Sequence, residues 1–195
     1  GIIPKEAIDL GGSAVGIIRK SVDLITDKKI KIGDRILLLK SNGVNTNGIS
    51  LIRAIAKKLP KGFGTKVTTY STFGELVLTQ TNIYATLIGE LQKAGVDIHY
   101  ISNITGHGLR KIMRARSKFS YLIDNIFDPQ EVFQFIQKEA KLSDEEMYGT
   151  FNMGQDYAIF LPEKDVAKAL RIIAKNGHLA INAGAIEKGP KQVII

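Results

Sequence analysis

The sequence predicts an α+β fold in which a mixed β-sheet carries its helices mainly on one face. Short apolar runs, such as residues 35–39, have the length and flanking turn residues of buried strands. Other segments, such as residues 47–59, repeat apolar residues at the spacing of an amphipathic helix. The segments follow neither strict strand–helix alternation nor a block of strands before a block of helices, which favours a mixed sheet.

The elements are expected in the following order along the chain. Strands at 13–18 and 35–39 precede a helix at 47–59 that Thr46 or Asn47 caps, a helix at 81–94 that ends at Gly95, and a strand at 96–101. A loop and helix at 105–116, a strand at 119–123 and a helix beginning with Asp128 and Pro129 come next. Ser143 and Glu146 form a capping box, followed by a strand at 157–161, a helix at 163–176, a strand at 178–186 and a further candidate strand at 193–195. We find no internal repeat or linker, so residues 1–195 are treated as one domain.

Composition restricts the possible functions. The net charge of +8, from 27 basic and 19 acidic residues, favours anionic ligands. The chain has no cysteine, which excludes disulfides and thiolate chemistry, and its three histidines lack metal-binding spacing, so we expect no metal site. No apolar run reaches the roughly 18 to 20 residues of a spanning helix, and we expect a cytoplasmic protein with no membrane association. Because the sequence begins with Gly1 inside an apparent strand and turn, we also expect further sequence upstream.

The stretch SNGVNTNG, residues 41–48, lies between a predicted strand and a predicted helix. A glycine-rich turn at a helix start exposes backbone N–H groups at the positive end of the helix dipole, which suits a phosphate or carboxylate. The alternative is that its glycines only permit positive φ angles while its asparagines cap the helix. Both interpretations remain open at this point.

Three further loops share this glycine-rich, polar character. They are DLGGSAVG (9–16), NITGHG (103–108) and EEMYGTFNMG (145–154). Loops grouped at the ends of sheet strands often form ligand clefts. The basic run LRKIMRARSK follows the second of these loops and is either a solvated helix face or an anion contact. His99 and His178 lie in or beside predicted strands and are assigned structural roles.

These motifs carry a family resemblance. The chain resembles the C-terminal domain of aminoimidazole ribonucleotide (AIR) synthase, also called phosphoribosylformylglycinamidine cyclo-ligase, of purine biosynthesis. The resemblance rests on DLGGSAVG, the pair Gly33-Asp34, SNGVNTNGISLIR, TNIY, NITGHGL and above all SDEEMYGTFNMG, which cover nearly the whole chain in the expected order. It implies an AIR synthase C-terminal-domain-like fold.

The resemblance also implies a division of labour with an N-terminal half that this sequence does not contain. In the family that half binds ATP with Mg²⁺ and forms the interface of a homodimer, while the C-terminal half closes the cleft over a phosphorylated small-molecule substrate. The family reaction phosphorylates the formyl amide oxygen of formylglycinamidine ribonucleotide, after which a nitrogen attacks and the imidazole ring closes. We therefore expect the partners of this chain to be its own N-terminal ATP-binding domain and a second copy, with no cofactor held tightly here and no catalysis by this domain alone.

The resemblance implies a set of cleft residues but assigns no catalytic residue. The expected substrate-binding residues are Ser41, Gly43, Asn45, Asn47, Gly48, Thr105, Gly106, His107, Thr150, Asn152 and Gly154, with Arg110 and Lys111 as candidate anion contacts. For His107 a surface or N-cap role is an equal alternative.

Departures from the family pattern keep other functions open. Asn45 and Asn103 stand where the family usually has histidine, and Asn82 stands where it often has arginine. An amide can donate a hydrogen bond but carries neither a titrating proton nor a charge. A paralogue that uses ATP to phosphorylate another small molecule is therefore one alternative, and a non-catalytic anion-binding or regulatory module is another. Nucleic-acid binding is disfavoured, because aromatic residues do not cluster with the basic ones.

Overall fold

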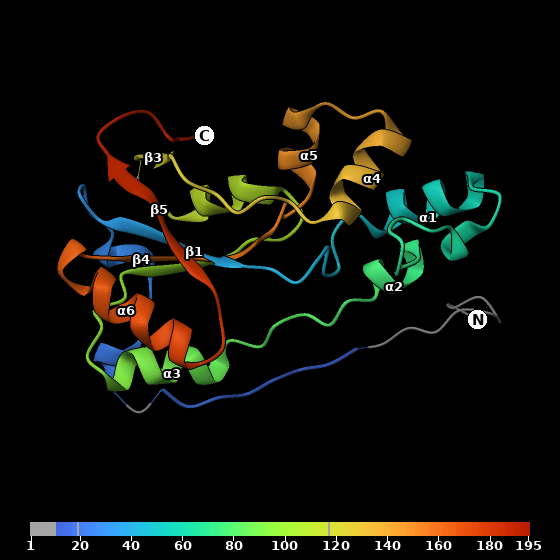
Figure 1. The fold of residues 1–195 in the computed structure, drawn as a ribbon. Helices are drawn as coiled ribbons and strands as arrows, with labels where there is room; N and C mark the ends of the chain where they lie inside the picture. Colours follow the sequence, from blue (N-terminus) through green and yellow to red (C-terminus); the bar gives the residue numbers. More distant parts are fainter. Residues whose placement is uncertain (1–10, 19, 117) are drawn as a thin grey trace.

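The computed structural model describes residues 11–18, 20–116 and 118–195, and Figure 1 shows the path of the chain. Within these residues, six strands form a single sheet. The strands are β1 (Arg35–Lys40), β2 (Tyr100–Asn103), β3 (Ser120–Ile123), β4 (Gln155–Leu161), β5 (Ala180–Glu187) and β6 (Gln192–Ile194). The α-helices are α1 (Ile49–Lys58), α2 (Phe73–Val77), α3 (Ala85–Lys93), α4 (Glu131–Ala140), α5 (Asp144–Thr150) and α6 (Glu163–Lys175), and the 3₁₀-helices are η1 (Ser21–Asp23), η2 (Asp27–Lys29), η3 (Gly62–Gly64) and η4 (Gly108–Arg114).

The sheet is mixed, with strand order β2-β4-β1-β5-β3-β6. β1 lies in the interior and pairs antiparallel with both β4 and β5, whereas β6 pairs parallel with β3. The predicted α+β class with a mixed sheet is confirmed. The central position of β1 explains why its sequence reads as a continuous apolar run, since both of its faces are covered.

Alternate residues of β1 enter two different cores. Ile36 and Leu38 pack on the face that η4 covers, together with Leu109 and Ile112. Leu37 and Leu39 pack on the opposite face, in the core to which α3 and α6 contribute. All four of these β1 side chains are fully buried, and each burial stabilises the fold by roughly 1.5–3 kcal/mol. The two α-helices that lie along the sheet, α3 and α6, thus share one face, as Figure 1 shows.

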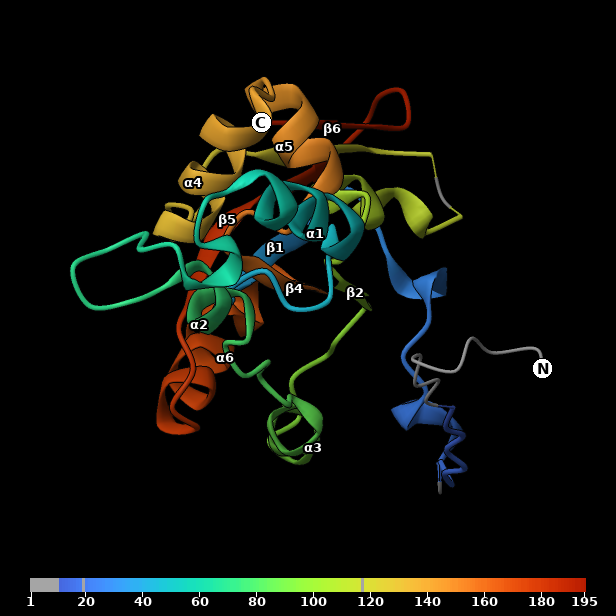
Figure 2. The same ribbon diagram turned by 90° about the vertical axis from the view of Figure 1, so that its right-hand side faces the viewer.

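The helices α1, α2, α4 and α5 gather around a third core beside one end of the sheet, which Figures 1 and 2 show from two directions. Phe73, Phe133 and Phe151 are fully buried there. The rings of Phe133 and Phe151 meet edge to face, with centroids 6.1 Å apart. This core anchors the first turns of α1 and the last turn of α5, between which the polar loops converge.

One predicted strand is wrong. Residues 11–18 have no regular secondary structure and are exposed, with Val15 at 99% and Ile17 at 87% of full exposure. A strand needs hydrogen-bonding partners for its backbone, and none of the six strands of the described sheet pairs with this segment. Asp9 and Leu10 of the DLGGSAVG motif lie outside the described residues.

Several predicted element boundaries also move. The N-cap of α1 is Gly48 in the left-handed region, not Thr46 or Asn47, and α4 is capped by Gln130 and not by Asp128. α3 begins at Ala85 and not at residue 81, and the segment 96–101 becomes β-structure only from Tyr100. The capping box of Ser143 and Glu146 is confirmed. Within the described part of the chain, no helix is long and apolar enough to cross a membrane.

Candidate functional site

Side-chain amides join the first polar loop, residues 41–48, to the third, residues 150–154. Asn47 Nδ2 donates to Asn152 Oδ1 across 3.3 Å, and Asn152 Nδ2 donates to the Gly43 carbonyl across 3.0 Å. Both asparagines are almost completely buried. A buried amide is costly unless it is hydrogen-bonded, so these two bonds fix the loops against each other. Asn47 therefore links two loops and does not cap α1.

The backbone strengthens the same junction. The Ser41 N–H donates to the Gly154 carbonyl across 2.8 Å, and Ser41 Oγ donates to the Gly43 carbonyl across 3.2 Å. Gln130 Nε2, from the start of α4, donates to the Ser41 carbonyl across 2.6 Å. These bonds satisfy the backbone of a buried loop end, where an unpaired carbonyl would be destabilising.

The second loop, residues 103–108, approaches the same junction. Gly106 lies against Asn47, because a Cβ on Gly106 would stand 4.0 Å from Asn47 Oδ1. Thr105 is partly buried beside it. His107 is exposed with a left-handed φ of 86° at the start of η4, and its side chain makes no capping hydrogen bond. The three loops therefore meet near Asn47, and His107 lies on the outside of the turn.

The predicted anion contacts have other neighbours. Arg110 Nη2 is 3.6 Å from Glu145 Oε1, and both side chains are largely exposed. Such a surface ion pair contributes about 0–1 kcal/mol. Thr150 and Arg110 line a separate hollow together with Leu51 and Glu145. Burial, with the nearby charge of Arg114, lowers the pKa of Lys111.

The most buried charge at this end of the sheet is Asp156, the second residue of β4, which the sequence analysis did not assign to the site. Asn45 Nδ2 donates to Asp156 Oδ1 across 2.7 Å. On the other oxygen, Tyr84 Oη donates to Asp156 Oδ2 across 2.6 Å and Asn82 Nδ2 across 3.2 Å. Asn42 Nδ2 in turn donates to Asn82 Oδ1 across 2.9 Å. We call these five residues the Asp156 network.

Neutral groups alone hold the Asp156 carboxylate. Asp156 is 2% exposed, and within the described residues it forms no ion pair with lysine, arginine or histidine. Burial raises the pKa of the Tyr84 phenol, and the hydrogen bond to Asp156 raises this pKa further.

A groove of about 540 Å³ adjoins the Asp156 network. Asn82 and Tyr84 belong to both, Ile88 and Gln92 line the groove from α3, and Ile83 and Tyr157 also contribute. The rings of Tyr84 and Tyr157 have centroids 4.6 Å apart, and His178 packs on Tyr84 from another direction with centroids 4.9 Å apart. We call this feature the α3 groove. Its lining combines apolar and aromatic side chains with the amides of Asn82 and Gln92, a mixture that ligand sites commonly have.

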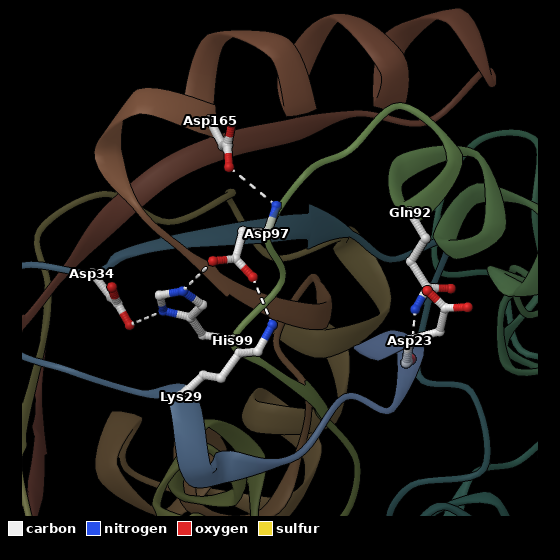
Figure 3. Close-up of polar contacts among 7 residues, drawn as sticks. All are labelled: Asp23, Lys29, Asp34, Gln92, Asp97, His99 and Asp165. Carbon is white, nitrogen blue, oxygen red and sulfur yellow. Dashed lines mark hydrogen bonds and ion pairs between the residues drawn. The ribbon is translucent and has the colours of Figure 1, made fainter. Parts of the chain in front are cut away.

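A second polar cluster lies at the other end of β1 and is drawn in Figure 3. His99 Nδ1 is 2.7 Å from Asp34 Oδ2, and His99 Nε2 is 3.1 Å from Asp97 Oδ2. Lys29 Nζ donates to Asp97 Oδ1 across 2.8 Å, and the Asp97 N–H donates to Asp165 Oδ2 across 3.0 Å. We call these residues the His99 network.

Each ring nitrogen of His99 faces a carboxylate oxygen of the His99 network, while Asp34 Oδ1 is buried without a hydrogen-bonding partner among the described residues. Ionised carboxylates only accept hydrogen bonds, so a His99 ring nitrogen that carries a proton donates to the carboxylate it faces. The ring is 3% exposed and Asp34 is fully buried. Within the described residues, no group of three His, Cys, Asp or Glu is placed to hold a metal ion. The geometry is that of a structural cross-link between η2, β1 and the segment before β2.

The signal for Asp156 was present in the sequence but was not used. Asp156 is a charged residue at the start of an apolar strand, directly after the FNMG loop. Two of its partners, Asn82 and Tyr84, belong to the TNIY motif, which we assigned to a helix. They instead form the segment before α3, where their side chains are free to turn toward β4.

The family model for AIR synthase related protein, C-terminal domain, matches residues 31–195. The chain belongs to this family. The match contains the three converging loops and both polar networks apart from Lys29. The junction at Asn47 thus lies within the residues that the model of this AIR synthase related domain matches.

Curated relatives are similar over nearly the whole chain. The phosphoribosylformylglycinamidine cyclo-ligase of Methanosarcina barkeri is 36% identical over 169 residues, which are 86% of this chain and 50% of the relative. The enzyme of that name from Methanocaldococcus jannaschii is 35% identical over 172 residues, 87% of this chain and 49% of the relative. The one from Lachnoclostridium phytofermentans is 33% identical over 205 residues, 100% of this chain and 58% of the relative. The chain thus spans about half the length of the curated relatives it matches.

Solved structures confirm the AIR synthase-like fold. E. coli HypE, a hydrogenase maturation protein, superposes with a TM-score of 0.58 at 15% identity, covering 87% of this chain and 48% of HypE. T. maritima PurL complexed with FGAR gives 0.54 at 11% identity, covering 89% and 27%. Thiamine-monophosphate kinase from Stenotrophomonas maltophilia K279a gives 0.54 at 15% identity, covering 87% and 52%. At these identities the likeness shows the fold alone.

Proposed function

We propose that this chain is the substrate-cleft half of an ATP-dependent cyclo-ligase that closes an imidazole ring in purine biosynthesis. The similarity to cyclo-ligases at 36% identity over 86% of the chain carries this proposal. The convergence of three polar loops on Asn47 supports it, because it supplies a rigid place to hold a substrate.

In the proposed reaction, ATP supplies the phosphoryl group that activates the formyl amide oxygen of formylglycinamidine ribonucleotide. A nitrogen of the same substrate then attacks the activated carbon, the carbon–oxygen bond breaks and phosphate leaves. The residues of this chain contribute positioning. Asn152 Nδ2 donates to the Gly43 carbonyl, and Asn47 Nδ2 donates to Asn152 Oδ1. Both side chains are therefore proposed to act by fixing the loop backbone that faces the substrate.

The remaining components are proposed to come from outside the chain. Within the described residues, no three His, Cys, Asp or Glu side chains are placed together to hold a metal ion. We place ATP and Mg²⁺ on an N-terminal half, the assembly in a homodimer and the protein in the cytoplasm. The length of the curated relatives, about twice the matched segment, supports the first of these assignments.

One observation favours a second candidate, the ATP-dependent phosphorylation of a different small molecule. Asn45 and Asn82, which stand where the family resemblance suggests histidine and arginine, are tied to the buried Asp156. Compared with the family pattern, a histidine and an arginine are replaced by neutral amides that bind the Asp156 carboxylate. The thiamine-monophosphate kinase whose fold is similar shows that this architecture also occurs in a kinase.

The test is to follow ADP release and imidazole formation by the intact gene product with Mg²⁺-ATP and formylglycinamidine ribonucleotide. We expect both products, and we expect Asn47→Ala and Asn152→Ala to lower kcat/KM about a hundredfold, as loss of positioning does. Thr46→Ala, an exposed residue of the same loop, is the matched control.

The other outcomes are equally informative. ADP release with other small molecules, without imidazole, would reject the cyclo-ligase and favour the kinase. A folded protein that releases no ADP with any acceptor would favour a non-catalytic module. Turnover that survives both asparagine substitutions would remove the loop junction from the mechanism.

A further inference from the structure

An open apolar recess of about 370 Å³ lies between α1 and α2, the two helices that are side by side in Figures 1 and 2. Two of its side chains are unusually exposed for their size, Phe63 of η3 at 44% and Leu78, directly after α2, at 84%. Exposed apolar surface of this kind often marks an interaction site. We call the recess the α1–α2 groove, and it is lined mainly by Ile49, Ile52, Arg53, Phe63, Val77 and Leu78.

The walls of the α1–α2 groove are fixed by the core beneath them. The Phe63 ring stacks on the fully buried Phe73 ring, with centroids 5.8 Å apart. Gly74 permits this packing, because a Cβ there would stand only 3.2 Å from the Cβ and the backbone oxygen of Phe63. On the other side, Ile52 is fully buried in the third core. A recess that is already formed needs little ordering when a partner's side chain enters it.

Basic residues surround the groove. Residues 49–78 contain five basic residues and one acidic residue, so this segment holds half of the chain's net charge of +8. Arg53 lines the groove itself, and Lys57 follows one turn later on the same face of α1. The other basic residues of the segment are Lys58, Lys61 and Lys66.

The one carboxylate of this segment is engaged elsewhere. Glu75 Oε2 accepts from the Thr72 N–H across 2.7 Å and from Thr72 Oγ1 across 2.9 Å, in the capping box of α2. These hydrogen bonds first, and then the charge of Lys66, lower the pKa of the Glu75 carboxyl. Among the described residues, none of the other four basic residues of the segment forms an ion pair. Their charges therefore lack the carboxylates that a partner can supply.

The lining decides which kind of occupant fits. Apart from the Arg53 guanidinium, the lining side chains are apolar, so the groove has few groups that could orient a small polar ligand. A recess instead receives a projecting apolar side chain. An amphipathic helix presents such side chains along one face, with polar residues on either side of them. Acidic residues in those flanking positions would meet the cations around the groove.

We propose that the α1–α2 groove docks an acidic amphipathic helix of a partner protein. The apolar face of the helix enters the groove between Ile52, Phe63 and Leu78, and its Asp or Glu side chains pair with Arg53 and Lys57. This inference goes beyond the proposed function, because the groove contains none of the residues expected to bind the substrate.

The experiment uses three fluorescent synthetic peptides on the order of 18 residues, long enough to form a helix. The first has leucines on one helical face and glutamates beside them, and the second has lysine in place of every glutamate. The third has the composition of the first but scatters its leucines around the helix. Fluorescence anisotropy measures the binding of each peptide to the intact gene product at physiological ionic strength.

We expect the first peptide to bind with a dissociation constant of about 100 μM or tighter, and the other two at least about tenfold more weakly. Failure of the first peptide to bind would overturn the proposal, and this is the result expected if another part of the gene product covers the groove. Equal binding of the first peptide and either of the others would also overturn it, because the site would then read only charge or only apolar surface.

Leu78→Ser tests the apolar wall without disturbing the core, because Leu78 is 84% exposed. The affinity for the first peptide should fall about tenfold. Leu179→Ser, at an apolar position that is 61% exposed and lies outside the groove, should leave this affinity unchanged. An unchanged affinity in Leu78→Ser would place the peptide elsewhere and overturn the proposal.

Combining Arg53→Glu with Lys57→Glu tests the charges. This double variant should bind the lysine peptide more tightly than the glutamate peptide, which reverses the preference of the wild type. Combining Lys164→Glu with Lys188→Glu makes the same change in net charge at exposed positions on α6 and after β5, and it should keep the wild-type preference. Reversal in both double variants would show an unspecific attraction between net charges and would overturn the proposal.

Two further measurements separate the other possible occupants. Self-association of the intact gene product that Leu78→Ser abolishes in analytical ultracentrifugation would assign the groove to a second copy. Binding to phosphatidylglycerol vesicles that Leu78→Ser abolishes, with no binding of the first peptide, would assign it to a membrane surface. Either result would overturn the proposal. None of these measurements involves ATP or turnover, so a failure of the proposed reaction is a separate result.

Discussion

The two ends of β1 each carry a buried carboxylate, and the two are accommodated by different means. Asp34, which directly precedes β1, is fully buried against the His99 ring. Asp156, next to the residue that pairs with Lys40 at the far end of β1, is 2% exposed and is held only by amides and a phenol. The partner of Asp34 is a buried imidazole, and this contact joins elements of the fold. The partners of Asp156 are neutral donors, which do not cancel a negative charge. Asp156 lies where the polar loops and the α3 groove meet.

The largest effect on stability is expected from His99→Ala. The substitution leaves Asp34 buried without its partner, and it also removes the bridge to Asp97. Breaking a buried pair by deleting one member costs about 3 to 5 kcal/mol. Chemical denaturation of the variant should show a loss of this size, whereas His107→Asn, an exposed position with a left-handed backbone that asparagine tolerates, should stay within about 0.5 kcal/mol of the wild type. A loss below about 1 kcal/mol for His99→Ala would contradict the role of the His99–Asp34 contact as a buried structural pair.

A pair of glycines extends the comparison to the backbone at the two ends. Gly33, before Asp34, and Gly48, at the start of α1, both have left-handed φ angles, of 86° and 63°. A Cβ on Gly33 would meet nothing within 4 Å, whereas a Cβ on Gly48 would overlap the Phe151 ring. Gly33→Ala should therefore cost about 1 kcal/mol from the backbone alone, and Gly48→Ala about 3 kcal/mol because overpacking adds to it. Equal losses in denaturation midpoint would show that Phe151 moves aside freely.

The fold was largely accessible from the sequence, because its main elements have strong local signals. The continuous apolar run of β1, the periodic apolar face of α6 and the capping box before α5 each act within a few residues. The prediction of a strand at 13–18 was wrong because no strand of the described sheet pairs with this segment, and the local sequence does not reveal whether a partner strand exists. The misplaced starts of α3 and α4 have a common physical origin: Asn82, Tyr84 and Gln130 use their side chains in long-range hydrogen bonds at the site, and the helices begin after them.

The candidate site was only partly accessible. Sequence located the loops, and the structure brings Gly43, Asn47 and Asn152 together. It did not reveal Asp156, since a carboxylate at the start of a strand is indistinguishable in sequence from an exposed one. Its burial results from contacts with residues 72, 74 and 111 positions away along the chain. The site residues themselves stay predictions until ligand binding is measured.

An intermediate effect is expected from Tyr84→Phe in alkali. The pKa of the Tyr84 phenol is raised from its ordinary value of 10.0, by burial first and then by its hydrogen bond to Asp156. The folded state therefore keeps a proton that the unfolded state loses above pH 10, and wild-type stability should fall by up to about 1.4 kcal/mol per pH unit on account of this group. Tyr84→Phe should remove that part of the slope in urea denaturation above pH 10, and Tyr70→Phe, exposed at 89%, should not. An unchanged slope in Tyr84→Phe would contradict the raised pKa of the Tyr84 phenol.

The smallest effect belongs to the outer edge of the His99 network, where Lys29 meets Asp97 with both side chains about half exposed (45% and 46%). The Lys29 hydrogen bond is the main cause that lowers the pKa of the Asp97 carboxyl below its ordinary 3.8. A lowered carboxyl pKa stabilises the fold above the unfolded value, and this contribution is lost as pH falls through the folded value. Lys29→Met should therefore cost under about 1 kcal/mol at neutral pH, because solvent screens the pair, and its deficit should shrink below pH 4. Lys28→Met, exposed beside it, is the control in the same pH series. A neutral-pH loss as large as that of His99→Ala would mean that the stability of the buried Asp34 depends on Lys29, through Asp97 and His99. The two ends of β1 would then differ in the length of their ionic networks.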